Sequence, residues 1–148
     1  MNKPLVTVMN GVNMNMLGQR DPKQYGCRTL DEINQGLGLL ADELGLAIEF
    51  FQSNFEGEFV EKIHAAHQNG TAGLLVNAGA WSHYNYAIAD ALAILRIPVI
   101  EVHMTNVQAR EEFRRFSVLS PMAVGIVAGF GENSYHLALR AMAGLIRK

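Results

Sequence analysis

The residues of this chain best suited to chemistry are a tyrosine, Tyr25, an arginine close before it, Arg20, and a distant histidine, His103. A tyrosine is a poor base at its ordinary pKa of about 10, but a neighbouring guanidinium favours the phenolate. His103 could supply a proton elsewhere on the same ligand. A base and an acid that act without a metal or cofactor indicate proton abstraction followed by elimination or isomerisation.

The hydrophobic pattern predicts alternating strands and helices that would position these residues. Apolar, β-branched runs predict strands at 5–10, 47–51, 73–77, 99–106 and 123–128. Helices are expected from Thr29 to Gly45 with a Thr29–Glu32 capping box, from the cap 52–54 to Gly70, at 84–95, at 107–114 after Thr105 or Asn106, and at 134–147.

This alternation predicts an α/β fold with a parallel sheet and right-handed crossovers. Five strands of this kind favour a flavodoxin-like three-layer sandwich with the strand order 2-1-3-4-5, formed by a single domain over residues 1–148. In that order the loops after strands one, three and four line one crevice. The loop 11–28 exceeds the usual βα connection of about 2–6 residues, and its closure could bring Arg20 and Tyr25 over a ligand.

Polar side chains cluster in the loops at this crevice. They are Asn13, Arg20 and Tyr25 after strand one, Asn77 and His83 after strand three, and Glu101, His103 and Thr105 at the end of strand four. The loops after strands two and five offer less, mainly Ser53, Asn54 and two glycines. The charged side chains of 110–115 are expected to form a solvated helix face.

Composition narrows the class of protein. The chain has 148 residues, 49% of them hydrophobic, and a net charge of −2 without a basic stretch that would indicate nucleic acid. A single cysteine, Cys27, excludes an internal disulfide framework and favours a reducing cytoplasm. The start of the chain has no signal-peptide pattern, and no apolar run approaches the ~20 residues that cross a bilayer. We therefore expect a cytoplasmic enzyme that binds neither membrane nor nucleic acid.

Other chemistries find little support in the sequence. His64 and His67 could share a metal, but a third ligand is missing, so a surface pair is expected and no metal. The Gly129–Gly131 segment lacks the third glycine of a dinucleotide fingerprint. No lysine lies in an apolar segment that would lower its pKa for a Schiff base; the four are Lys3, Lys23, Lys62 and Lys148. We expect no cofactor.

Five motifs spread over almost the whole chain resemble one family. They are 10–18 with Arg20, Pro22 and Tyr25–Gly26; 52–54 with 56–57; 77–80 with 82–83; 101–103 with Asn106; and 109–114. Together they resemble the type II 3-dehydroquinate dehydratases. The resemblance implies anti elimination of water from 3-dehydroquinate, which gives 3-dehydroshikimate.

The resemblance also implies a role for each catalytic residue. Tyr25 would remove the proton α to the ketone, with Arg20 favouring its phenolate. An enolate would form, and Asn13 would hold a water against its oxygen. His103, oriented by Glu101, would protonate the departing hydroxyl.

The remaining site residues would bind substrate. Asn77 and the backbone of Met104 and Thr105 would hold its carboxylate, and His83 and Arg114 would bind its ring hydroxyls. Family members assemble as trimers grouped into a dodecamer, in which Asp90 would reach a neighbouring subunit's site.

The sequence departs from the family pattern in several places, and some of these departures are near Asp90. Tyr84 and Asn85 replace a usual Thr-Ser pair, and Ala89 replaces a usual arginine. The role of the enzyme stays open between the shikimate pathway of aromatic amino acid biosynthesis and quinate catabolism. Two other functions compete: a flavodoxin-like module that binds FMN or phosphate, and a catalytically silent assembly protein.

Overall fold

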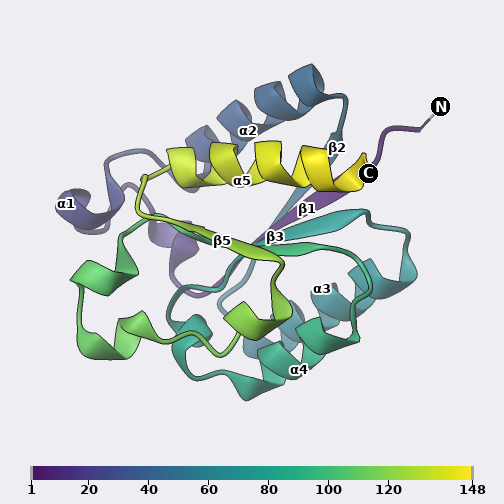
Figure 1. The fold of residues 1–148 in the computed structure, drawn as a ribbon. Coiled ribbons are helices and arrows are strands. Elements are labelled where there is room, and N and C mark those ends of the chain that lie inside the picture. Colours follow the sequence, from purple (N-terminus) through teal and green to yellow (C-terminus); the bar gives the residue numbers. More distant parts are fainter. Residues whose placement is uncertain (1, 148) are drawn as a thin grey trace.

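The structure of the protein is a computed structural model that describes residues 2–147. Five parallel strands form one sheet in the order β2-β1-β3-β4-β5 (Figure 1). The strands are β1 (Leu5–Asn10), β2 (Ala47–Gln52), β3 (Gly73–Asn77), β4 (Val99–His103) and β5 (Gly125–Ala128). The predicted flavodoxin-like strand order is therefore confirmed.

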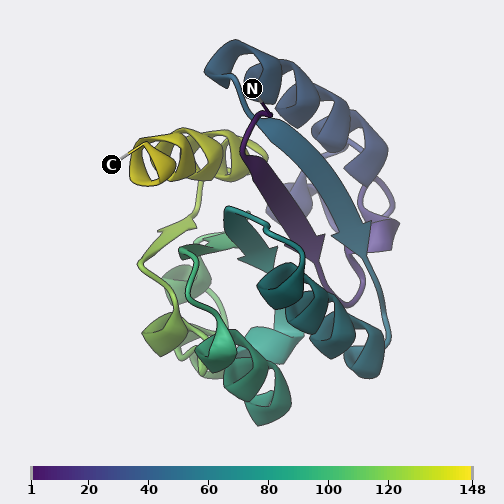
Figure 2. The same cartoon turned by 90° about the vertical axis from the view of Figure 1, so that its right-hand side faces the viewer.

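Helices cover both faces of the sheet. They are α1 (Pro22–Tyr25), α2 (Leu30–Leu44), α3 (Glu56–Gln68), α4 (Tyr86–Ile94) and α5 (Asn133–Ile146). The long helices α2 and α5 lie on one face, and α3 and α4 lie on the other (Figures 1 and 2). This is the predicted three-layer sandwich. Among residues 2–147, no helix combines the length and apolar character needed to span a membrane.

Strand β1, which lies between β2 and β3, contributes side chains to the core on both faces of the sheet. Val6 and Val8 join the core beneath α2 and α5, whereas Met9 joins the core beneath α3 and α4, and all three side chains are fully buried. Successive side chains of a strand point to opposite faces, so a strand covered on both faces is mostly apolar. The polar exception inside β1 is Thr7, whose buried hydroxyl donates to Glu49 at 2.8 Å, and the site residues follow the carboxyl end of the strand.

The start of α2 confirms the predicted capping box. The Thr29 hydroxyl accepts a hydrogen bond from the Glu32 amide at 3.2 Å, and the Glu32 carboxylate accepts one from the Thr29 amide at 3.0 Å. Two amide donors at the helix start are thereby satisfied. Gly45 ends the helix in the left-handed conformation, with φ of 73°.

The helix predicted over 107–114 is wrong. Two short 3-10 turns, Val107–Ala109 and Glu112–Arg115, stand there instead. The Asn106 side chain does cap the first turn by accepting from the Gln108 amide at 3.1 Å. The chain then becomes extended at Arg110, and the Gln108 side-chain amide donates to the Arg115 carbonyl at 3.2 Å. Side-chain contacts thus hold the segment in turns where a helix would need a continuous backbone ladder.

Other predicted boundaries shift by a few residues. Helix α3 begins at Glu56 without a side-chain cap, because Ser53 accepts from the Phe55 amide rather than from inside the helix. Helix α4 begins at Tyr86, since Asn85 is its cap and accepts from the Ile88 amide at 2.9 Å. Strand β5 begins only at Gly125.

The long loop 11–28 is more ordered than its polarity predicts. It contains a 3-10 turn at Met14–Met16 and the short helix α1. The Asp21 side chain caps α1 by accepting from the Lys23 amide at 3.0 Å, and Pro22 occupies the first helical position. The last residue of α1 is Tyr25, so this cap sets where the phenol lies.

Candidate active site

A cavity of about 120 Å³ lies at the carboxyl ends of β1, β3 and β4. This is where an open α/β sheet is expected to hold a ligand. Most of the predicted site residues line it: Asn13, Arg20, Tyr25, Asn77, His83, His103, Met104, Thr105 and Arg114. The convergence expected from the strand order is therefore confirmed, although these residues are far apart in the sequence.

Two guanidinium groups contact Tyr25 in different ways. Arg110 donates a hydrogen bond from Nη1 to the phenolic oxygen at 2.8 Å and also to the Thr105 hydroxyl at 3.3 Å. The guanidinium of Arg20 lies over the phenol ring, 3.8 Å from its centroid. The sequence indicated Arg20 as the partner of the Tyr25 phenol. In the structure, however, it is Arg110 that hydrogen-bonds to the phenolic oxygen.

Arg110 is a cavity-lining residue that the sequence pattern misses. A helix over 107–114 would turn it toward solvent, whereas the extended backbone at 110 directs it into the cavity, with its side chain only 13% exposed. Its presence in the motif 109–114 is the one signal that could have pointed to it.

His103 lines the same cavity as Tyr25 and contacts Glu101. Its Nε2 contacts Glu101 Oε2, while the Ser120 hydroxyl donates to the other carboxylate oxygen, Oε1, at 2.5 Å. Burial raises the pKa of Glu101, but hydrogen bonds from His103, Ser120 and Ser117 outweigh it and hold the pKa below its ordinary value. Glu101 therefore stays ionised and directs the imidazole.

His83 stacks on His103, with ring centroids 6.3 Å apart and planes within 17°. Its Nδ1 donates to the Phe116 carbonyl at 2.8 Å. Burial is the main cause that lowers the pKa of His83, and the positive charges of His103 and Arg114 lower it further. The hydrogen bond to the Phe116 carbonyl raises this pKa, but not enough to offset the other effects. The ring is neutral at pH 7, and its Nε2 is available to accept from a ligand.

Asn77 belongs to a buried polar network that reaches α5. Its side-chain amide donates to the Tyr135 hydroxyl at 2.8 Å, and that hydroxyl donates to the Asn10 side-chain oxygen at 2.6 Å. Burial raises the pKa of Tyr135 far above its ordinary value, so the phenol stays neutral and can donate. The network fixes Asn77 at the cavity wall, and nothing in the sequence analysis indicated the part that Tyr135 plays.

Asn13 has the left-handed backbone conformation, with φ of 69°. Asparagine tolerates this conformation better than most residues. The Asn13 amide donates to the Asn54 side chain at 2.9 Å, and Gln52 donates to the same oxygen at 3.2 Å. The loop after β2, which the sequence suggested would offer little, therefore supports Asn13 from behind.

The charged side chains that line the cavity are basic. Arg20, Arg110 and Arg114 all line it, and its described lining includes no aspartate or glutamate. Two buried guanidinium nitrogens, Arg20 Nη1 and Arg110 Nε, have no hydrogen-bond partner within the part of the chain described. A ligand with a carboxylate or developing negative charge would satisfy such donors.

Comparison with known proteins agrees with this geometry. A family model described as dehydroquinase class II matches residues 4–143. The 3-dehydroquinate dehydratase of Pelobacter propionicus is 56% identical over 141 residues, which cover 95% of each chain. This chain belongs to the class II dehydroquinase family.

Solved class II dehydroquinases share the whole fold. The enzyme from Propionibacterium acnes superposes with a TM-score of 0.93 at 44% identity, covering 97% of this chain and 98% of that chain. The one from Butyrivibrio crossotus gives a TM-score of 0.93 at 39% identity, covering 95% and 97%. The resemblance carried by the motifs is thus confirmed over nearly the full length.

Two predicted site residues of this class II dehydroquinase do not line the cavity: Glu101, which contacts His103, and Asp90. Asp90 is exposed on α4 and does not line the cavity. Two of the family departures beside it have structural reasons here, because Asn85 caps α4 and Ala89 is buried in the core beneath that helix. We found no structural reason for Tyr84, which is 59% exposed.

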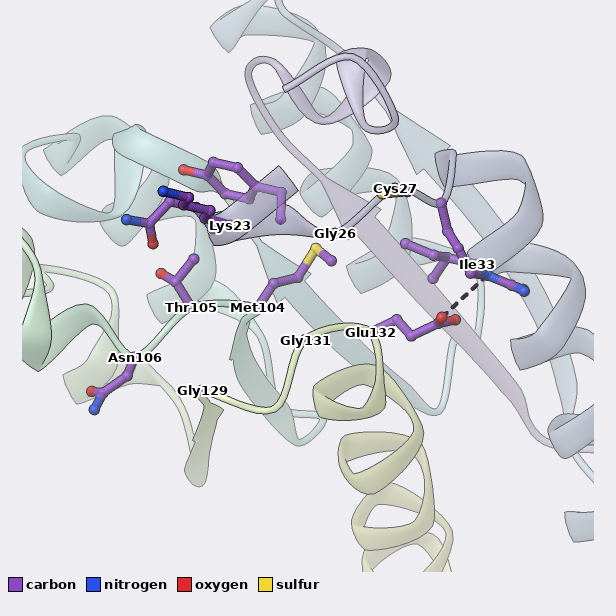
Figure 3. A pocket seen from close by; sticks show the side chains of 13 residues that line it. Lys23, Gly26, Cys27, Ile33, Met104, Thr105, Asn106, Gly129, Gly131 and Glu132 are labelled. Atoms are coloured by element: carbon purple, nitrogen blue, oxygen red, sulfur yellow. Dashed lines mark ion pairs between the residues drawn. The ribbon is translucent and has the colours of Figure 1, made fainter. Parts of the chain in front are cut away.

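Tyr25 also lines a second cavity, of about 360 Å³. Figure 3 shows this cavity with Met104, Thr105 and Glu132 among its lining residues. Tyr25, Met104 and Thr105 line both cavities. The ion pair between Arg28 and Glu132, at 3.1 Å, joins the end of the loop 11–28 to the start of α5 (Figure 3). This pair anchors the segment that carries Tyr25.

Proposed function

We propose that this chain converts 3-dehydroquinate to 3-dehydroshikimate by an anti elimination of water that passes through an enolate. Class II dehydroquinases catalyse this dehydration, in the shikimate pathway or in quinate catabolism. The observation that carries the mechanism is the pairing of Tyr25 with Arg110 and Arg20 in the cavity that also holds His103. A guanidinium-stabilised phenolate is the base, and an imidazolium is the acid.

Tyr25 takes the first step. Its phenolate removes the proton on the carbon next to the ketone, and the electron pair of that bond moves to the ketone oxygen. The positive charges of Arg110 and Arg20 stabilise the phenolate before the transfer. Asn13 binds a water that donates to the enolate oxygen, which stabilises the charge that develops there.

His103 takes the second step. The enolate re-forms the ketone, its electrons form the carbon–carbon double bond, and the carbon–oxygen bond to the leaving hydroxyl breaks. His103 gives that hydroxyl a proton, so it departs as water. Glu101 holds Nε2 of the ring, which leaves Nδ1 to act as the donor.

The remaining lining residues bind the substrate. Asn77 and the backbone of Met104 and Thr105 hold its carboxylate. His83 and Arg114 bind its ring hydroxyls, for which a neutral imidazole and a guanidinium are complementary partners. The three arginines of the cavity favour this anionic substrate over a neutral one.

The assembly and location of the enzyme are part of the same proposal. We expect one catalytic domain over 1–148, trimers grouped into a dodecamer, and Asp90 at a neighbouring subunit's site. A cytoplasmic location, favoured by the single cysteine, stays a prediction. The proposal requires neither metal nor cofactor.

A spectrophotometric assay tests the reaction, because the conjugated enone of the product absorbs where the substrate does not. We expect turnover without added metal or cofactor. Tyr25→Phe and His103→Ala should each lower kcat by about 100-fold or more while the circular dichroism spectrum is unchanged. Near-normal turnover by Tyr25→Phe would show that another residue is the base. Inactivation by borohydride with substrate would show a covalent imine instead.

A further inference from the structure

We infer that Ser120 is a positioning residue for the acid step: its hydroxyl anchors Glu101, and Glu101 in turn holds His103 in the orientation that protonates the leaving hydroxyl. The inference rests on the proposed role of His103. It adds a residue from the end of the β4–β5 connection, whose first part already supplies Thr105, Arg110 and Arg114 to the site.

The carboxylate of Glu101 is held at both oxygens. The Ser120 hydroxyl donates to Oε1 at 2.5 Å, and His103 contacts Oε2. Glu101 is only 2% exposed, so little water competes for either oxygen. Fixing one oxygen of a carboxylate also fixes the position of the other. The orientation of the His103 imidazole, which contacts that second oxygen, is then fixed as well.

Ser120 is itself fixed by the turn that carries it. The Ser117 hydroxyl accepts from the amides of Leu119 and Ser120, at 3.1 and 3.3 Å. The Leu119 side chain is 1% exposed, and the Val118 amide donates to the Ser82 carbonyl at 2.8 Å. The hydroxyl therefore comes from an anchored turn and not from a freely moving surface residue.

The space behind the pair shows why this anchor matters. A cavity of about 210 Å³ lies there, lined by Glu101, His103, Ser120 and two arginines, Arg114 and Arg115. Without the Ser120 hydroxyl, the carboxylate has room to rotate and guanidinium partners toward which to rotate. His103 would then lose the acceptor that orients it while the substrate cavity stays intact.

The test is Ser120→Ala, with Ser120→Thr as the matched control that keeps a hydroxyl. We expect Ser120→Ala to lower kcat about tenfold, a fraction of what loss of the acid itself would cost. KM should change less than twofold, because Ser120 does not line the substrate cavity. Ser120→Thr should recover most of the activity, and Ser120→Cys, a weaker donor, should fall between.

Isotope effects identify the step that slows. With substrate deuterated at the carbon that Tyr25 deprotonates, the primary isotope effect on kcat/KM for Ser120→Ala should be at or below the wild-type value. The solvent isotope effect should rise, because protonation of the leaving group becomes limiting. A larger primary effect, an increased KM or an unchanged kcat would each overturn the inference. Wild-type protein and His103→Ala, assayed in parallel, test the proposed function separately.

Discussion

Tyr25 is contacted by two arginines that do different work. Arg110 donates to the oxygen that must carry negative charge, whereas Arg20 lies over the ring face. A hydrogen bond to a charged oxygen is directional and strengthens as the charge develops. Contact of a cation with a ring face is weaker and less directional. We therefore assign the larger share of phenolate stabilisation to Arg110.

This assignment predicts different effects for two substitutions of Arg110. Arg110→Gln removes the charge and should lower kcat/KM by roughly 10- to 150-fold, which corresponds to a charge-assisted hydrogen bond of about 1.5–3 kcal/mol. Arg110→Lys keeps the charge without the planar guanidinium and should lose less. Steady-state kinetics on folded variants measure both.

Arg96→Gln is the matched control, since Arg96 is exposed and does not line the cavity. It removes one positive charge and should leave kcat/KM within twofold of the wild-type value. If Arg96→Gln and Arg110→Gln have equal effects, net charge and not contact with Tyr25 is what the kinetics report.

Among the elements, α5 takes part in the site through one side chain. Tyr135 is fully buried and joins α5 to the carboxyl ends of β1 and β3 through Asn10 and Asn77. Buried polar groups stabilise a fold only when they are paired. The hydroxyl of Tyr135 therefore supports both the helix–sheet packing and the orientation of Asn77.

Tyr135→Phe should lower the free energy of unfolding by about 1–3 kcal/mol, because the Asn77 amide and the Asn10 oxygen lose a buried partner. Urea denaturation followed by circular dichroism measures the change. Tyr86→Phe, at a tyrosine that is 70% exposed, should unfold like the wild type. Equal midpoints for the Tyr135 variant and the wild type would mean that water replaces the hydroxyl without loss.

The elements also show which features a sequence can predict. The capping box at Thr29 and the strand order were predicted correctly because one depends on neighbouring residues and the other on the alternation of strands and helices. The turns over 107–115 were not predicted. Their conformation depends on contacts made by side chains, such as that of Gln108 with the Arg115 carbonyl, which local propensity does not contain.

The residues of the candidate site also differ in whether the sequence could predict their positions. Residues at strand ends, such as Asn77 and His103, could be placed from the strand order alone. Arg110 could not, because its direction depends on the extended backbone between two turns. The roles of Tyr135 and Ser120 could not be predicted from sequence pattern either, because their partners Asn77 and Glu101 lie 58 and 19 positions away in the chain.

At the scale of the whole molecule, two predicted site residues do not line the cavity of their own chain: Glu101, which contacts the lining residue His103, and Asp90. Asp90 is exposed on α4, near the exposed aromatic rings of Tyr84 and Tyr86, which are 59% and 70% exposed. Exposed aromatic residues beside a functional side chain are typical of a protein–protein contact. We therefore expect the complete site to need a second copy of the chain.

Mixed assembly of two inactive variants tests this expectation. Asp90→Ala should lose activity although its own cavity is intact, and Tyr25→Phe should be inactive for lack of the base. A site formed by Tyr25 of an Asp90→Ala chain and Asp90 of a Tyr25→Phe chain has both residues. In a symmetric assembly of randomly mixed chains, about a quarter of the sites have this composition. After joint denaturation and refolding, activity should therefore rise well above that of either parent. Mass spectrometry would show whether mixed assemblies form. If they form and gain no activity, Asp90 does not contribute to the site of a neighbouring subunit.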